Sequence, residues 1–198
     1  MSDRTCNFDG ACLYKGVGVD IVFGCGCNYV GIDLGLKGAI VIIDKQGNHL
    51  QSFDMPTIKV TTGKKKKNEV DLPNLKNIIN NNINYNDYVI IEKTQAVPSL
   101  PGKITSSPQA NHSLGFLEGF VTGILSQRNV RHELQLPSVW QRYYGIRGKG
   151  KDTKVASYKI ASKIFPQMVF HTIRGRMLDG RADAVLLAEW ARRRLTNE

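Results

Sequence analysis

The sequence predicts an α/β domain with a mixed five-stranded sheet, in which two parallel strands follow three antiparallel strands and helices flank the sheet. The order of the apolar patterns supports this fold: three strand-like runs come first, and helix-like and strand-like segments then alternate before two terminal helices. The length agrees, because 198 residues can bury one core but are too few for two large lobes.

The first three strands are expected at residues 29–35, 38–44 and 49–55. YVGIDLG and GAIVIID are short apolar runs, HLQSFDM follows them, and the residues between the second and third runs form a turn. Short connections join antiparallel neighbours, so these three strands are predicted to form a meander.

A polar stretch at 57–70 separates the meander from the next elements. It contains four consecutive lysines and is expected to be a loop. The following LPNLKNIINNNI is expected to be a helix because its apolar residues, Leu72, Leu75, Ile78 and Ile79, have helical spacing. The fourth strand, DYVIIE, comes directly after this helix.

The second half contains further helices and one more strand. A Pro- and Ser-rich loop leads to the helix ANHSLGFLEGFVTGILSQ, whose three glycines share one face and predict close backbone packing against the sheet or a partner helix. VRHELQL is the fifth strand, and SVWQRYYGI begins a short helix before the basic loop RGKGKDTK. Two helices follow, near 154–164 and 178–194.

All four cysteines lie in the first 27 residues, within a predicted N-terminal appendage, 1–28, ahead of the main domain, 29–198. In a reducing compartment, cysteines this close in sequence indicate zinc more often than disulfides, although their spacing departs from paired C-x2-C knuckles. A flexible arm whose thiols have no particular role is the other interpretation. The candidate zinc ligands are Cys6, Cys12, Cys25 and Cys27.

The charge of the chain indicates a polyanionic partner. There are 27 Lys and Arg residues against 17 Asp and Glu, a formal charge of +10 that favours nucleic acid. Such a charge can serve only solubility, but the basic residues are grouped, which predicts a phosphate-binding surface whose affinity falls with salt. The candidate nucleic-acid contacts are Lys64, Lys65, Lys66, Lys67, Lys93, Arg147, Lys149, Lys151, Arg174 and Arg176.

The sequence shows no pattern typical of membrane insertion or secretion. No apolar run approaches the roughly 18 residues of a membrane span, and MSDRTCNFDGACLYKG lacks the basic-then-apolar pattern of a signal peptide. We therefore expect a soluble cytoplasmic protein with no membrane partner. If the chain is viral, that cytoplasm is the host's.

Two carboxylates lie at the ends of apolar strands. Asp33 sits in V-G-I-D-L-G and Glu92 ends V-I-I-E, where an ionised group is costly unless it is paired or binds a cation. Gly35 beside Asp33 leaves room for a ligand. Taken singly, Asp33 could cap a turn and Glu92 could face solvent. Two strands that each end in an acid favour one shared site at an edge of the sheet.

A second pair of acids begins the last predicted helix. Asp179 and Asp183 are four residues apart, so a helix projects both from one face, where like charges repel unless a cation lies between them. Asp179 could also be an N-cap, which is compatible with metal binding. All four acids together form an all-oxygen site that suits Mg²⁺ or Mn²⁺, and two such ions would support in-line phosphodiester hydrolysis.

Several motifs occur in order between residues 29 and 194: GIDLGLKGAIVIID, VIIEKTQAVP with a later GFLEGFVTGIL, PSVWQRYYG, KDTKVASYKIASKIFP and DGRADAVLLAEWARR. As an ordered set they resemble the RuvC-like Holliday junction resolvases of the ribonuclease H-like superfamily. The resemblance is strongest to the phage and organellar branch, because the bacterial branch spaces its last two acids three residues apart instead of four.

The resemblance implies a metal-dependent endonuclease that acts as a homodimer and nicks opposing strands of a four-way DNA junction symmetrically. The residues implied to bind metal and act in catalysis are Asp33, Glu92, Asp179 and Asp183, with Lys154 near the scissile phosphate. Family members insert a residue of the loop after the second acid into the junction. This loop has no aromatic residue, and Leu100 is its candidate.

Three other interpretations compete with a junction resolvase. A nuclease for other branched or flap DNA, or for RNA, would use the same acids, since a fold does not fix its substrate. A catalytically inactive junction-binding protein would not need all four acids. GIDLG also resembles the first phosphate loop of actin-like and chaperone ATPases, but that fold needs two lobes and 198 residues leave no space for them.

Overall fold

The computed structural model of the chain describes residues 4–6, 12–16, 19–23, 27–63, 65–95, 107–146 and 153–196. Its central sheet has the strand order β10-β9-β4-β5-β6. β4, β5 and β6 are antiparallel neighbours, whereas β9 and β10 run parallel to β4. This order confirms the predicted mixed sheet of the ribonuclease H-like layout. The strands are β4 (Tyr29–Asp33), β5 (Ala39–Ile43), β6 (His49–Asp54), β9 (Tyr88–Glu92) and β10 (Arg131–Gln135).

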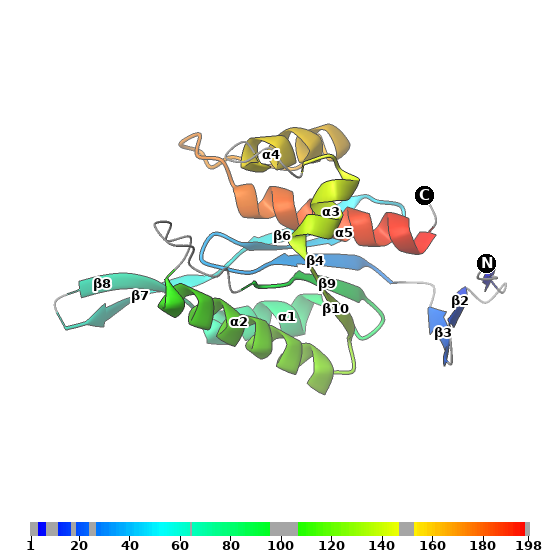
Figure 1. The fold of residues 1–198 in the computed structure, drawn as a ribbon, viewed down its shortest axis with the longest axis horizontal. Coiled ribbons are helices and arrows are strands. Elements are labelled where there is room, and N and C mark those ends of the chain that lie inside the picture. The colour runs from blue at the N-terminus through cyan, green and yellow to red at the C-terminus, as the bar shows by residue number, and fades with distance from the viewer. Residues whose placement is uncertain are drawn as a thin grey trace, which may run out of the picture.

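Helices cover both faces of this sheet (Figure 1). One face packs against α1 and α2, and the other packs against α3, α4 and α5. The central strands are therefore buried on both sides, which explains why their sequences are almost continuously apolar. None of the described helices combines the length and apolarity needed to cross a membrane. The helices are α1 (Leu72–Asn82), α2 (Pro108–Gln127), α3 (Pro137–Tyr143), α4 (Thr153–Ile164) and α5 (Asp179–Thr196).

The polar segment after β6 is a β-hairpin, so the prediction of a loop at 57–70 was wrong. β7 (Thr57–Thr62) pairs with the antiparallel β8 (Lys65–Val70), and the pair forms a two-stranded sheet separate from the central one. Threonine, isoleucine and valine dominate β7, and such β-branched residues favour extended backbone even where charged residues face them across the ladder.

The glycine face of α2 is open in the part of the chain that the structure describes. A Cβ atom added at Gly115, Gly119 or Gly123 would meet nothing within 4 Å. The predicted packing of this face against the sheet is therefore wrong. The helix instead buries Leu117, Val121 and Leu125 in the core.

The N-terminal segment contains a small sheet of its own. β1 (Arg4–Cys6), β2 (Cys12–Gly16) and β3 (Val19–Phe23) are antiparallel, and Cys6 pairs with Cys12 in the backbone register. Cys25 and the thiols of Cys6 and Cys12 lie outside the described part of the structure. Cys27 is buried, and this burial raises the pKa of its thiol. The zinc site and the division at residue 28 remain predictions.

Candidate active site

The register of the sheet brings Asp33 and Glu92 to the same level and the same face. Ile32 of β4 pairs with Ile91 of the parallel strand β9, so one further step along both strands aligns the two acids. Side chains alternate between faces along a strand. Because Tyr29 and Ile90 contact the α5 side of the core, the two acids also point toward α5. The predicted meeting of two strand-end carboxylates is thus observed.

Helix α5 approaches this point closely because glycines leave space for its backbone. A Cβ atom at Gly31 would overlap the backbone oxygen of Ala184, and one at Gly180 would overlap the backbone oxygen of Lys37. Asp179 and Asp183 lie in the first two turns of α5, beside these contacts. Two strands and one helix therefore deliver an acid cluster, a name we use for Asp33, Glu92, Asp179 and Asp183.

Burial and mutual repulsion disfavour ionisation within the acid cluster. The pKa of Asp33 is raised well above its ordinary value, first by burial and then by the charges of Glu92, Asp183 and Asp179. Burial also raises the pKa of Glu92 to about 7 and that of Asp183 to about 6. Each of these side chains nevertheless keeps some contact with solvent, which leaves a route for an ion or a water molecule.

Neighbouring groups hold the acids in place. The indole Nε1 of Trp140, a fully buried residue of α3, donates a hydrogen bond of 3.1 Å to Glu92 Oε2. The Lys154 ammonium of α4 forms an ion pair with Asp179 Oδ2, and its side chain is 60% exposed. The buried hydroxyl of Ser157 lies near Asp183 and lowers its pKa, although it forms no hydrogen bond of normal geometry.

The chemistry of the acid cluster fits a divalent metal. Carboxylate oxygens are the ligands that Mg²⁺ and Mn²⁺ prefer, and Asp183 Oδ1 is buried without a hydrogen-bond partner, which is costly unless a cation compensates it. Within the described ranges, however, no group of three or more His, Cys, Asp or Glu side chains is arranged so that it could hold a metal ion. Lys154 occupies Oδ2 of Asp179, so a metal that binds this oxygen must displace the ammonium.

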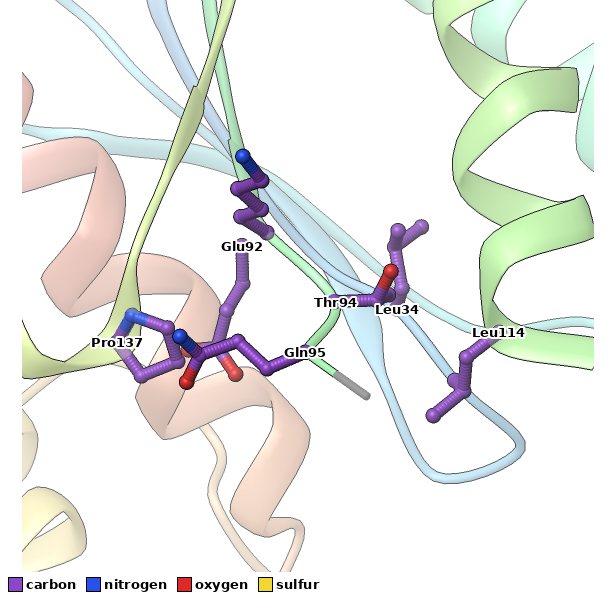
Figure 2. Close-up of a pocket in the computed structure, with 7 residues that line it drawn as sticks. Leu34, Glu92, Thr94, Gln95, Leu114 and Pro137 are labelled. Carbon is purple, nitrogen blue, oxygen red and sulfur yellow. The ribbon is translucent and has the colours of Figure 1, made fainter. Parts of the chain in front are cut away.

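A pocket of about 250 Å³ adjoins Glu92 (Figure 2). Gln95 and Pro137 line the pocket near the Glu92 carboxylate, and Leu34 and Leu114 line its apolar end. The loop that lines this pocket is fixed from α2, because Glu118 Oε2 accepts hydrogen bonds of 2.7 and 2.8 Å from the backbone N–H and the hydroxyl of Thr94. The segment that follows Glu92 is therefore held in place where it lines the pocket.

The predicted basic contacts occupy different places around the acid cluster. Lys93 follows Glu92 and lines the pocket. Arg174 and Arg176 are exposed in the turn that precedes α5. Lys67 is an exposed residue of β8 and forms an ion pair of 2.6 Å with Glu69. The predicted contacts Lys64, Arg147, Lys149 and Lys151, the side chain of Lys65, and the candidate wedge Leu100 lie outside the described part of the structure.

Sequence reasoning missed the residues that support the acids. Trp140 lies in a recognised motif, but nothing in the sequence pairs it with Glu92, which is 48 residues away. Glu118 likewise lies in a helix, and nothing in the sequence links it to Thr94, which is 24 residues away. The glycine in V-G-I-D is the one available signal, because glycine weakens a strand and often marks a close backbone approach.

Without divalent metal, we expect the fold to lose stability as pH rises. Below its ordinary pKa of 4.5, Glu92 is protonated in both the folded and unfolded states, but between 4.5 and about 7 it ionises in the unfolded state while burial keeps it protonated in the folded state. The free energy of unfolding should therefore fall with rising pH, by at most about 3 kcal/mol from this residue.

This pH dependence can be measured as the Tm in EDTA at pH 5 and pH 8. Glu92→Gln is the matched variant, because it keeps the acceptor for Trp140 but removes the titration, so its Tm should fall less. An equal fall in both proteins would contradict the prediction. Addition of Mn²⁺ at pH 8 should raise the Tm of the unaltered protein more than that of the variant.

No family model matches the chain, and no curated protein matches it. Similar solved structures include a T. thermophilus RuvC in complex with Holliday junction substrate, with 10% identity and a TM-score of 0.45 over 84% of this chain and 94% of that one. They also include a Thermus thermophilus RuvC structure, with 13% identity and a TM-score of 0.47 over 85% and 95%. The fold of this chain is defined by the strand order and directions given above.

Proposed function

We propose that this chain is a metal-dependent DNA endonuclease of the RuvC-like type, in its phage and organellar branch, that resolves four-way junctions by paired nicks. The observation that carries the proposal is the convergence of four acids from three separate elements on one face of the sheet. The pKa values of Asp33, Glu92 and Asp183 are raised, so the described protein groups do not fully compensate the charge of these three acids, and divalent cations would do so.

The four acids of the cluster would hold the metal. When bound, a pair of divalent ions supplies a nucleophilic water and stabilises the leaving oxygen of the phosphodiester. Trp140 orients Glu92 through its hydrogen bond, and the hydroxyl of Ser157 lies near the Asp183 carboxylate. Lys154 is exposed enough to exchange Asp179 for a phosphate oxygen when metal and substrate enter.

A junction substrate accounts for the charge and for the sequence resemblance. The formal charge of +10 favours a long polyanion, and exposed basic side chains lie before α5 as well as on the β7–β8 hairpin. Paired nicks on opposing strands require two equivalent sites, so the proposal includes a homodimer with a two-fold axis. A nuclease for flaps or other branched DNA and an inactive junction-binding protein are the alternatives that the test must separate.

The test compares labelled substrates under three metal conditions. We expect symmetric paired nicks on a synthetic four-way junction in Mg²⁺ or Mn²⁺, none in EDTA, and little cutting of a linear duplex of the same sequence. Preferential cutting of a flap would support the broader nuclease instead. Tight junction binding without cutting in any metal would overturn the enzyme and leave a binding protein.

A further inference from the structure

The β7–β8 hairpin has two chemically different faces, which its register defines. Directly opposed residues of an antiparallel pair share a face, and successive residues alternate between faces. Lys59 pairs with Asn68 and Thr61 pairs with Lys66, which places these four residues together. We call them the basic face. Ile58 pairs with Glu69, Val60 with Lys67 and Thr62 with Lys65, and these residues form the opposite face.

Among the hairpin lysines whose side chains the structure describes, the two without an ion pair to a described residue, Lys59 and Lys66, both lie on the basic face. All four side chains of this face are exposed. On the opposite face, Glu69 neutralises Lys67 across 2.6 Å, and two β-branched apolar residues lie beside them. The hairpin is therefore not a uniformly charged tip but a ribbon with one side suited to an anion.

The hairpin begins at the same end of the sheet as the acid cluster. Asp33 pairs with Ala39, which also pairs with Asp54, so the last residue of β6 is level with Asp33 across two strand spacings. The root of the hairpin is fixed there, because Met55 donates to Gly38 O at 2.9 Å and Asp71 donates to Pro56 O at 2.9 Å. From this root the ribbon projects beyond the body of the domain (Figure 1).

We propose that the basic face of this ribbon binds a duplex arm of the DNA substrate, away from the scissile phosphate. The occupant follows from shape and charge, since the major groove admits a two-stranded β-ribbon and its edges carry phosphates. Diagonal neighbours such as Lys59 and Lys66 are about 7–8 Å apart at Cβ, roughly two base-pair rises of 3.4 Å. Thr61 and Asn68 lie between them and supply hydrogen-bonding groups.

This inference rests on the proposed function, because it assumes a branched substrate with duplex arms. It refines the sequence prediction in two ways: it adds Lys59, and it places Lys67 on the opposite face of the ribbon, where Glu69 forms an ion pair with it. The distance from the acid cluster to the basic face is limited by the length of the hairpin. Six residue pairs span about 20 Å and two strand spacings about 10 Å, so the contact lies within roughly nine base pairs of the cut.

The test measures binding in EDTA, so that cutting does not interfere. The double variant Lys59→Gln with Lys66→Gln is compared with a control that removes the same charge elsewhere, Lys45→Gln with Lys76→Gln, two exposed lysines outside the hairpin. On a four-way junction with arms of about 20 base pairs, the first should lower affinity roughly 10- to 60-fold near 0.1 M salt and reduce the salt slope by about two. The control should stay within about threefold.

Arm length separates a ribbon contact from a general loss of charge. On a junction whose loop-closed arms have about 4 base pairs, too short to reach the basic face, both double variants should bind alike. Equal weakening by the two variants on long arms, or a deficit of the first that persists on short arms, would overturn the proposal. Cutting of the short-arm junction in Mg²⁺ tests the proposed function separately, because its absence in every protein leaves the binding result intact.

Discussion

Asp33→Asn should lower the rate of junction nicking by roughly 10³-fold or more, while binding to the junction stays within about threefold. Asp33 lies centrally in the acid cluster, since its pKa responds to all three other acids. Asparagine has the same shape as aspartate but carries no negative charge, so the variant should bind a divalent metal more weakly. A metal contributes several kcal/mol of transition-state stabilisation, and 1.36 kcal/mol corresponds to a tenfold change in rate.

The measurement is a single-turnover nicking rate in Mg²⁺, with binding measured in parallel in EDTA. Asp54→Asn is the matched control, because Asp54 is an acid on the same face and at the same level of the sheet, yet it is neutralised by Arg181 at 2.6 Å. We expect its nicking rate to change by less than about threefold, since this exposed ion pair is worth at most about 1 kcal/mol. An equal fall in nicking rate in both variants would show that activity is sensitive to any change of charge at this edge of the sheet. A fully active Asp33→Asn would exclude the acid cluster as the catalytic centre.

The acids could be predicted from sequence because each of them breaks an expected pattern. Asp33 and Glu92 interrupt apolar strands, where an uncompensated charge is costly. Asp179 and Asp183 have the spacing of one helical turn, so they share a face whatever the helix packs against. These patterns are local, so they can be identified without knowledge of the tertiary contacts. The pairing of two parallel strands is then sufficient to bring Asp33 and Glu92 together.

The remaining features depend on contacts between distant segments. The hairpin at 57–70 was mistaken for a loop because its lysines dominate the composition, while the pairing that stabilises it is a property of two strands. The glycines of α2 show the reverse error: a regular stripe predicted close packing against the sheet or a partner helix, but a Cβ atom added at any of the three would meet no described segment within 4 Å, so packing against the sheet is wrong and packing against a partner helix stays a prediction. Composition and periodicity identify a face, but they do not identify what covers it.

Gly31→Ala should destabilise the fold by about 3 kcal/mol or more, the upper end of the cost of overpacking a core. The added methyl group would overlap the backbone oxygen of Ala184 and lie 2.8 Å from the backbone nitrogen of Ala188. Neither atom can rotate away as a side chain can, so α5 must move off β4. Since α5 carries Asp179 and Asp183, the same shift would separate them from the acids of the sheet.

Gly115→Ala tests the same substitution where the structure leaves space. The added methyl group would meet nothing within 4 Å, and alanine in a helix is favoured over glycine by about 1 kcal/mol, so this variant should be slightly more stable. Thermal and urea unfolding of the two variants should therefore shift in opposite directions from the unaltered protein. If Gly31→Ala unfolds at the same urea concentration as the unaltered protein, α5 does not pack on β4 as closely as described, and the delivery of its two acids to Asp33 and Glu92 loses its structural basis.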